Sequence, residues 1–97
     1  MSNLVVNIIY TGKDDNAKLF AKEMIESGLV AKIRNQEGNI SYDYYQPMEN
    51  SNSILLIDIW TDQKALDIHH KSPMMKEIAK LRDKYKLHMK VTRYIPE

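Results

Sequence analysis

The chain has 97 residues, 43% of them apolar and 28% charged, which is typical of one globular domain. Lys and Arg number 14 and Asp and Glu 13, so the net charge of +1 does not supply the basic field that binds nucleic acid or an anionic membrane. The sequence contains no Cys, which excludes disulfides, thiolate metal sites and cysteine nucleophiles. We therefore expect a single domain over residues 1–97 with no nucleic-acid or membrane partner.

The N-terminal segment predicts a strand rather than a targeting signal. Residues 3–11, NLVVNIIYT, are rich in β-branched side chains and end at Thr11-Gly12, a pattern typical of a strand buried on both faces. This apolar stretch is short, contains Asn7 and lacks a basic leader, so it matches neither a signal peptide nor a membrane span. We expect a cytoplasmic protein.

Helical and strand patterns alternate along the rest of the chain. Apolar residues at helical spacing from Asp14 predict one long helix that ends near Gly38, with Gly28 marking a kink or a break into two helices. The later elements are strands over residues 39–47 and 53–60, a short helix capped by Thr61 or Asp62, a second helix started by Ser72-Pro73 as N-cap and first residue, and a strand over residues 87–95.

This β-α-β-β-α-β order predicts an α+β fold of the ferredoxin-like type, a four-stranded antiparallel sheet with helices on one face. The other face then has no cover. Leu55, Ile57 and Ile59 lie on the side of their strand opposite Trp60, where no element of the chain remains to pack on them. We therefore expect a two-fold homodimer joined through this face.

Asp58 is the most informative residue, because it places a carboxylate in the middle of an apolar strand, where an unpaired charge costs several kcal/mol. Strand periodicity puts Asp58 and Trp60 on one side, and His69 lies on the apolar side of the helix that follows. We expect Asp58 and His69 to form a hydrogen-bonded pair. Such a pair either ties the helix to the sheet or presents an acid or base to a substrate.

Four further residues have both a structural and a functional interpretation. Asn7 is a lone amide in an apolar strand, either a satisfied core residue or a donor to a substrate oxygen. Trp60 is either a core aromatic or the wall on which a planar ligand stacks. Met74 is either core or an adaptable pocket wall. Tyr42 belongs to a group of three tyrosines in one strand, which could stack on bases as in RNA-binding sheets. The chain, however, lacks the basic surplus and the aromatic-glycine motif of such sheets.

The sequence carries no strong metal or cofactor motif. His69 and His70 point about 100° apart on a helix, and no second ligand stands four residues away. Glycine-rich phosphate loops, the G-x-S-x-G elbow and H-E-x-x-H are all missing. We expect neither a metal site nor a cofactor.

Three runs in this order and spacing, EGNISYDYYQP, ILLIDIW and DQKALDIHHKSPMM, resemble the antibiotic biosynthesis monooxygenase family. The family pattern is an acidic-Gly-Asn-x-x-Tyr strand, an acidic residue two positions before a Trp, and an Ala-Leu-x-x-His helix that leads to Ser-Pro. The resemblance covers nearly the whole chain. It implies a dimeric α+β barrel of ferredoxin-like subunits that, in characterised members, oxidises quinols or polycyclic phenols with O2 without metal or flavin.

The resemblance carries over to individual positions. Asn7, Trp60 and His69 match pocket residues of the family, and Asp58 stands where the family more often has Glu. Met74 stands where the family often has a His, so a role for that His does not transfer.

A haem-degrading branch similarly has an Asn in the first strand and a Trp in the third. Its haem-ligating His falls near Ala79, where this chain has no ligand.

The resulting hypothesis is a cofactor-independent monooxygenase that acts on a quinol-like or polycyclic phenolic substrate. Its expected parts are His69 as base, Asp58 as the residue that orients it, Asn7 on the substrate oxygen, and Trp60, Tyr42 and Met74 around the ring. Two alternatives stay open, a small-carbonyl isomerase that uses the same base, and a module that binds an aromatic ligand or haem without turnover.

Overall fold

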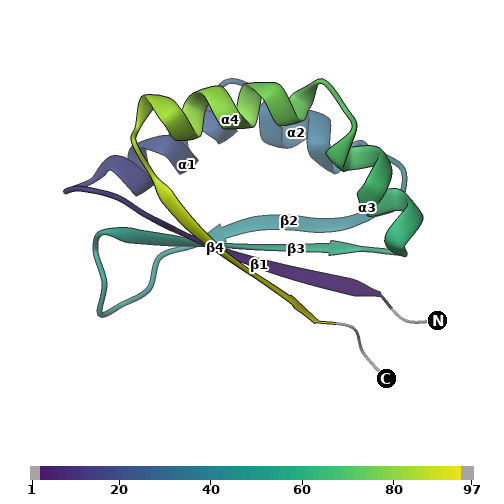
Figure 1. Ribbon diagram of the computed structural model, residues 1–97, viewed down its shortest axis with the longest axis horizontal. Coiled ribbons are helices and arrows are strands. Elements are labelled where there is room, and N and C mark those ends of the chain that lie inside the picture. Colours follow the sequence, from purple (N-terminus) through teal and green to yellow (C-terminus); the bar gives the residue numbers. More distant parts are fainter. Residues whose placement is uncertain (1–2, 95–97) are drawn as a thin grey trace.

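The computed structural model describes residues 3–94 and consists of a four-stranded antiparallel sheet with the helices on one face (Figure 1). In chain order the elements are β1 Leu4–Thr11, α1 Asn16–Glu26, α2 Leu29–Arg34, β2 Asn39–Tyr45, β3 Ser53–Trp60, α3 Gln63–His70, α4 Met74–Lys84 and β4 His88–Tyr94. The strand order β2-β3-β1-β4 confirms the predicted ferredoxin-like fold. Ile95, the last residue of the predicted final strand, lies outside the described residues.

Gly28 breaks the first helical segment into α1 and α2. Its φ of 84° lies in the left-handed region, which interrupts the right-handed helix after Glu26. The prediction of a single long helix is therefore wrong, and the alternative of a break at Gly28 is correct. Glycine is the residue that adopts this conformation at least cost.

The second helical segment also differs in detail from the prediction. Asp62 caps α3 as expected, because its side chain accepts a hydrogen bond from the Ala65 amide at 2.8 Å. The start of α4 is displaced by one residue, since Pro73 occupies the N-cap position. Ser72 instead donates its hydroxyl to the His69 carbonyl at 2.7 Å and joins the end of α3 to the following turn.

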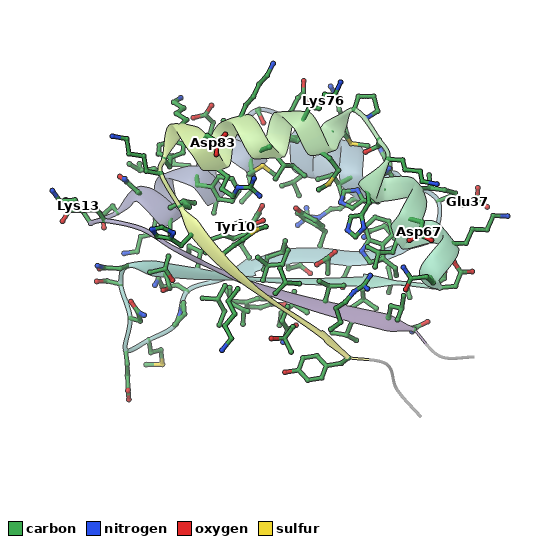
Figure 2. All side chains as sticks on the ribbon, in the orientation of Figure 1. Tyr10, Lys13, Glu37, Asp67, Lys76 and Asp83 are labelled. Atoms are coloured by element: carbon green, nitrogen blue, oxygen red, sulfur yellow. The ribbon has the colours of Figure 1, made fainter. Side chains whose placement is uncertain are left out.

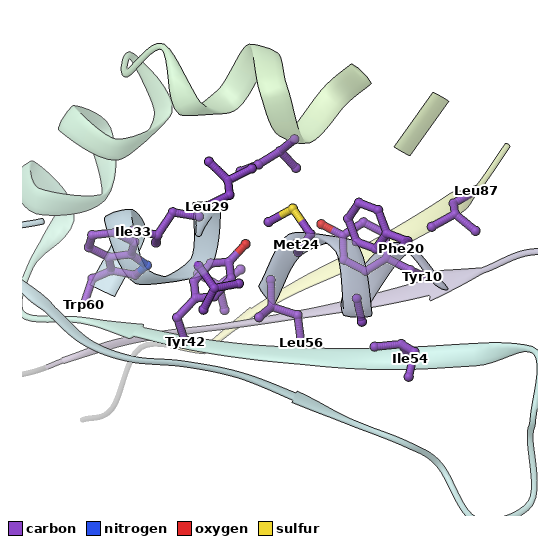
Figure 3. Close-up of a cluster of buried hydrophobic side chains, with 14 of the residues drawn as sticks. Tyr10, Phe20, Met24, Leu29, Ile33, Tyr42, Ile54, Leu56, Trp60 and Leu87 are labelled. Carbon is purple, nitrogen blue, oxygen red and sulfur yellow. The ribbon is translucent and has the colours of Figure 1, made fainter. Parts of the chain in front are cut away.

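The hydrophobic core lies between the sheet and the helix layer (Figure 3). Alternate residues of β1 and β3 point into it, and Phe20, Met24 and Ile33 meet them from α1 and α2. The ring centroids of Tyr10 and Phe20 lie 4.7 Å apart. This layer of apolar side chains fixes the helices that carry the candidate site.

The opposite face of the sheet carries no helix (Figure 1). The register pairs Asn7 with Ile57, and both lie on the side of the sheet opposite Asp58 and Trp60. On this face Ile9 is 41% exposed and Tyr94 51% exposed. The predicted uncovered apolar face is confirmed, whereas the dimer stays a prediction.

No helix within residues 3–94 is long and apolar enough to cross a bilayer.

Candidate functional site

Asp58 and Trp60 occupy the helix-facing side of β3, as the alternation of the strand predicts. The carboxylate of Asp58 is flanked by Val6 of β1 and Tyr42 of β2, its neighbours in the sheet. Asp58 is only 4% exposed, and Trp60 is fully buried. The carboxylate therefore sits inside the domain, in the layer between sheet and helices.

The two oxygens of the Asp58 carboxylate have different surroundings. The Trp60 indole Nε1 donates a hydrogen bond to Oδ2 at 2.7 Å. Oδ1 is fully enclosed and has no hydrogen-bond partner among the described residues. Burial raises the pKa of Asp58 from its usual 3.8 to about 6, although the hydrogen bond from Trp60 works against that rise. The site thus contains a buried carboxylate, one oxygen of which has no hydrogen-bond partner among the described residues.

His69 comes to the same cluster from α3. Gly38 lets the start of this helix approach β2 closely, because a Cβ at that position would collide with the Ala65 Cβ. The His69 ring then stacks on Trp60 with the ring centroids 4.7 Å apart and an interplanar angle of 26°. Burial, aided by His70, lowers the pKa of His69 from 6.5 to about 4, so the ring is neutral at pH 7.

The predicted hydrogen bond between Asp58 and His69 is wrong. The carboxylate takes its hydrogen bond from Trp60, and His69 Nδ1 lies 2.7 Å from Gln36 Oε1. Both residues do face the helix layer, but Trp60 is the neighbour that they share. Sequence reasoning missed Gln36, which lies in a polar turn before β2 and carries no pattern of its own.

Three tyrosines extend the polar cluster. Tyr42 is buried, and its ring lies edge-on to His69 at 6.4 Å and to Tyr44 at 5.9 Å between centroids. Burial raises the pKa of Tyr42 and Tyr44, and it raises the pKa of Tyr10 to about 12, with the charge of Asp58 adding to each rise. The hydroxyls are therefore protonated at neutral pH. The Tyr44 hydroxyl is enclosed and interacts with the Tyr42 hydroxyl, which opposes the rise in its pKa, but no hydrogen bond of normal distance and angle reaches it among the described residues.

β4 flanks β1 at the edge of the sheet, and its residues are exposed. Figure 2 shows Tyr10 between the sheet and α4, and its partners on β4 face the same layer. Met89 pairs with Tyr10 and Val91 with Ile8, yet these two β4 residues are 47% and 48% exposed. Arg82 of α4 reaches over this strand, where it donates to Met89 Sδ at 3.4 Å. The cluster itself stays buried, since Tyr10 is 2% exposed and Asp58 4% exposed.

Asn7 is not brought to Asp58 in the way the prediction required, whereas the role of Met74 as a pocket wall stays a prediction. Asn7 lies on the helix-free face beside Ile57 and Thr92, and its Oδ1 is enclosed without a hydrogen-bond partner among residues 3–94. It is on the wrong side of the sheet to act on a substrate held by Asp58 of the same chain. Met74 is half-buried and packs against the core.

Two surface grooves lie outside this cluster. One of about 290 Å³ lies between α1, α2 and α4 and is lined by Glu23, Ser27, Leu29, Lys32, Glu77, Lys80 and Leu81. The other, of about 440 Å³, is lined by Gln36, Glu37, Gly38, Thr61, Asp62, Lys64, Ala65 and Ile68. Gln36 belongs to the second groove and, through its bond to His69, also to the buried cluster.

Within residues 3–94, no group of three or more His, Cys, Asp or Glu side chains could hold a metal ion.

Known proteins resemble the chain at the levels of sequence and fold. Residues 3–81 match the sequence model of a family described as antibiotic biosynthesis monooxygenase. An uncharacterised protein of Synechocystis is 34% identical over 48 residues, which are 50% of this chain and 33% of that protein. The match therefore covers about a third of the length of this curated relative.

Solved structures share the fold over nearly their whole length. A conserved protein of unknown function from Bacteroides thetaiotaomicron has a TM-score of 0.85 at 18% identity over 98% of both chains. A candidate antibiotic biosynthesis monooxygenase of Deinococcus radiodurans has 0.84 at 13%, over 97% of this chain and 92% of its own. SnoaB, a cofactor-independent oxygenase of Streptomyces nogalater, has 0.81 at 14%, over 100% and 95%. At these identities the likeness shows the fold alone.

Proposed function

The chain belongs to the antibiotic biosynthesis monooxygenase family, and we propose that it oxidises a quinol or polycyclic phenol with O2, with Asp58 as the base that removes the hydroxyl proton. The state of the Asp58 carboxyl group carries the choice of base. Asp58 is buried, its Oδ1 has no partner among the described residues, and its pKa is raised to about 6. A general base works best when its pKa lies near the operating pH.

The chemistry needs such a base because a phenolate gives an electron to O2 far more readily than the neutral phenol does. Asp58 takes the hydroxyl proton, and one electron passes from the phenolate to O2. The radical pair joins through a new C–O bond at a ring carbon that carries hydrogen. That carbon loses its proton, and the O–O bond breaks. One oxygen atom stays as a quinone carbonyl and the other leaves as water, so a four-electron oxidation of the ring balances the four-electron reduction of O2.

Asp58 suits the role of base better than His69 does. The pKa of His69 is lowered to about 4, which makes the neutral imidazole a weak base, and its Nδ1 is occupied by Gln36. His69 and Trp60 instead supply a stacked aromatic wall beside the carboxylate. Tyr42 closes the cluster on the β2 side. These contacts favour a flat aromatic substrate with a hydroxyl directed at Asp58.

A second copy of the chain is part of the proposal. The helix-free face exposes Ile9 and Tyr94 around the central Leu55, Ile57 and Ile59, and a two-fold axis lets the same patch cover itself. Asn7 then lies at the dimer interface rather than in the Asp58 site.

The proposal is tested by O2 uptake with an anthrone-like phenol or a reduced naphthoquinone. Asp58→Asn should lower kcat/KM by about 10²- to 10⁴-fold, the usual contribution of a positioned base. Asp67→Asn is the matched control, because Asp67 is an exposed residue on α3 whose carboxylate accepts a hydrogen bond from the exposed Gln63. A chelator should leave the rate unchanged. Since such substrates autoxidise, each rate is taken as the excess over the same mixture without protein.

The pH profile separates the two candidate bases. Wild-type kcat/KM should rise with pH to a plateau above about pH 6, following the pKa of Asp58. An inflection near pH 4 would assign the base to His69 instead. Equal rates for wild type and Asp58→Asn would refute the proposal. Proton exchange at carbon in a carbonyl compound, without O2 uptake, would favour the isomerase.

A further inference from the structure

Gln36 determines where the proton of His69 sits. The side-chain oxygen Oε1 of Gln36 lies 2.7 Å from His69 Nδ1. An amide oxygen only accepts hydrogen bonds, so Nδ1 must carry the proton. The backbone of Gln36 is itself fixed, because its amide donates to the Ile33 carbonyl at 3.0 Å and its carbonyl accepts from the Asn39 amide at 3.1 Å. The acceptor is therefore presented to His69 from a rigid turn.

The other ring nitrogen is consequently an acceptor. A neutral imidazole has a single proton, and burial keeps His69 neutral at pH 7. With that proton on Nδ1, Nε2 offers a lone pair. No hydrogen bond joins Nε2 to any residue that the structure describes.

Asp58 adds a second acceptor beside the same indole. Its Oδ2 is occupied by Trp60 Nε1, which uses the donor of that ring. Oδ1 is enclosed and has no partner among residues 3–94. Trp60 contacts both groups, through the hydrogen bond to Asp58 and through the stacking on His69. The Tyr44 hydroxyl, which can both donate and accept, is the further enclosed group without a partner there.

We propose that Gln36 is a positioning residue that holds His69 in the Nδ1–H tautomer, so that the cluster selects aromatic ligands that donate hydroxyl hydrogens over ligands of the same shape that only accept. This inference rests on the proposed function and narrows its substrate to the reduced, hydroxyl-bearing form. The quinone product has lost the hydroxyl hydrogen that Asp58 removes, which favours its release. Sites that pair buried polar groups with a substrate hydroxyl discriminate strongly against analogues that lack it.

The tautomer is measured by ¹⁵N NMR of the histidine rings at pH 8, without any substrate. Wild-type His69 should show a protonated Nδ1 and an unprotonated Nε2. Gln36→Glu keeps an acceptor oxygen and should keep this tautomer. Gln36→Leu removes the acceptor and should shift His69 toward a mixture. Gln63→Leu, at an exposed glutamine of α3, is the matched control and should resemble wild type.

Selectivity is measured by quenching of Trp60 fluorescence, since Trp60 is the sole tryptophan. The probes are 1,4-dihydroxynaphthalene and its dimethyl ether, which have the same ring, under anaerobic conditions. Wild type should bind the dihydroxy compound about tenfold or more tightly than the ether. Gln36→Leu should lose most of that preference, and Gln36→Glu should retain it.

Failure of this inference can be told apart from failure of the proposed function. A wild-type His69 protonated on Nε2, an equal affinity for both probes, or no binding of either would overturn the inference even if O2 is consumed. The expected tautomer and selectivity without O2 uptake would support the inference and refute the oxidation. A Gln36→Leu variant with undiminished preference for the dihydroxy probe would refute the positioning role.

Discussion

Replacing Asp58 by Asn should stabilise the protein at alkaline pH while it removes activity. Asn has nearly the same shape, and its amide oxygen can still accept the hydrogen bond from Trp60 Nε1, which the carboxylate accepts at 2.7 Å. The change removes the cost of a buried negative charge. A site that gains stability when its charged group is neutralised is typical of a functional group held against stability.

The magnitude follows from the pKa of Asp58. Burial raises it from 3.8 to about 6, so the folded state holds the proton more tightly than the unfolded chain does. A carboxyl with a raised pKa makes its full contribution to stability below pH 3.8, and this contribution is lost as pH rises through about 6. At 1.36 kcal/mol per pH unit, the loss is about 3 kcal/mol in total, of which about 2 kcal/mol falls between about pH 4.5 and 8.

The assay is denaturant unfolding of wild type and Asp58→Asn at several pH values, followed by the fluorescence of Trp60. The difference in unfolding free energy, variant minus wild type, should rise by about 2 kcal/mol between about pH 4.5 and 8. Taking the difference cancels the other titrating groups, because they are present in both proteins. A difference that stays constant with pH, or falls as pH rises, would refute the argument that burial perturbs Asp58.

Two further substitutions test other parts of the structure. Ile57→Asp should convert the proposed dimer into monomer or insoluble protein, because it buries an unpaired charge at the interface. Sedimentation velocity measures the change, with Ile68→Asp on the exposed side of α3 as the control, and an unchanged dimer would refute the proposed interface. Tyr44→Phe should leave the unfolding free energy unchanged or raise it by up to about 1 kcal/mol, because it deletes a buried hydroxyl without a partner among the described residues. Tyr45→Phe, at an exposed tyrosine, is the control. If Tyr44→Phe lowers the unfolding free energy by more than about 1 kcal/mol, the Tyr44 hydroxyl is hydrogen-bonded in solution and the argument fails.

The position of Asp58 and Trp60 could be predicted from the sequence because a strand has a strict period of two. The face of Asn7 could not, since β1 is apolar on both sides: Leu4 and Val6 point to the helices while Val5 and Ile9 point away. The apolar pattern of such a strand does not indicate which of the two sets of alternate residues faces the helices. The pairing with β3 decides it, and that is a tertiary property.

The partner of His69 was out of reach for a different reason. The spacing of α3 placed the ring on the buried side, and that prediction is correct. Which of several polar groups meets the ring depends on how the turn before β2 folds back over α3. Gln36 lies 33 positions away in the chain, with no periodic pattern to reveal it. By contrast, the break at Gly28 could be anticipated, because glycine alone tolerates a left-handed residue within a helical run at little cost.

Asp58 and His69 together make the cost of this site to folding stability nearly independent of pH in the wild-type protein. The pKa of His69 is lowered from 6.5 to about 4, so stability from this group is present above pH 6.5 and is lost as pH falls toward 4, by about 3 kcal/mol. Asp58 loses a similar amount in the opposite direction. The two slopes nearly cancel between pH 4 and 6.5, which leaves a flat profile with a cost of about 3 kcal/mol at every pH. Asp58→Asn should reveal the pH dependence that His69 contributes, so that the variant gains stability as pH rises while wild type does not.

A total stability of about 5–15 kcal/mol makes a constant cost of this size substantial, and an apolar pair in the same two positions would avoid it. A buried acid and a buried imidazole on one indole are therefore better explained by a ligand that they bind than by the stability of the fold.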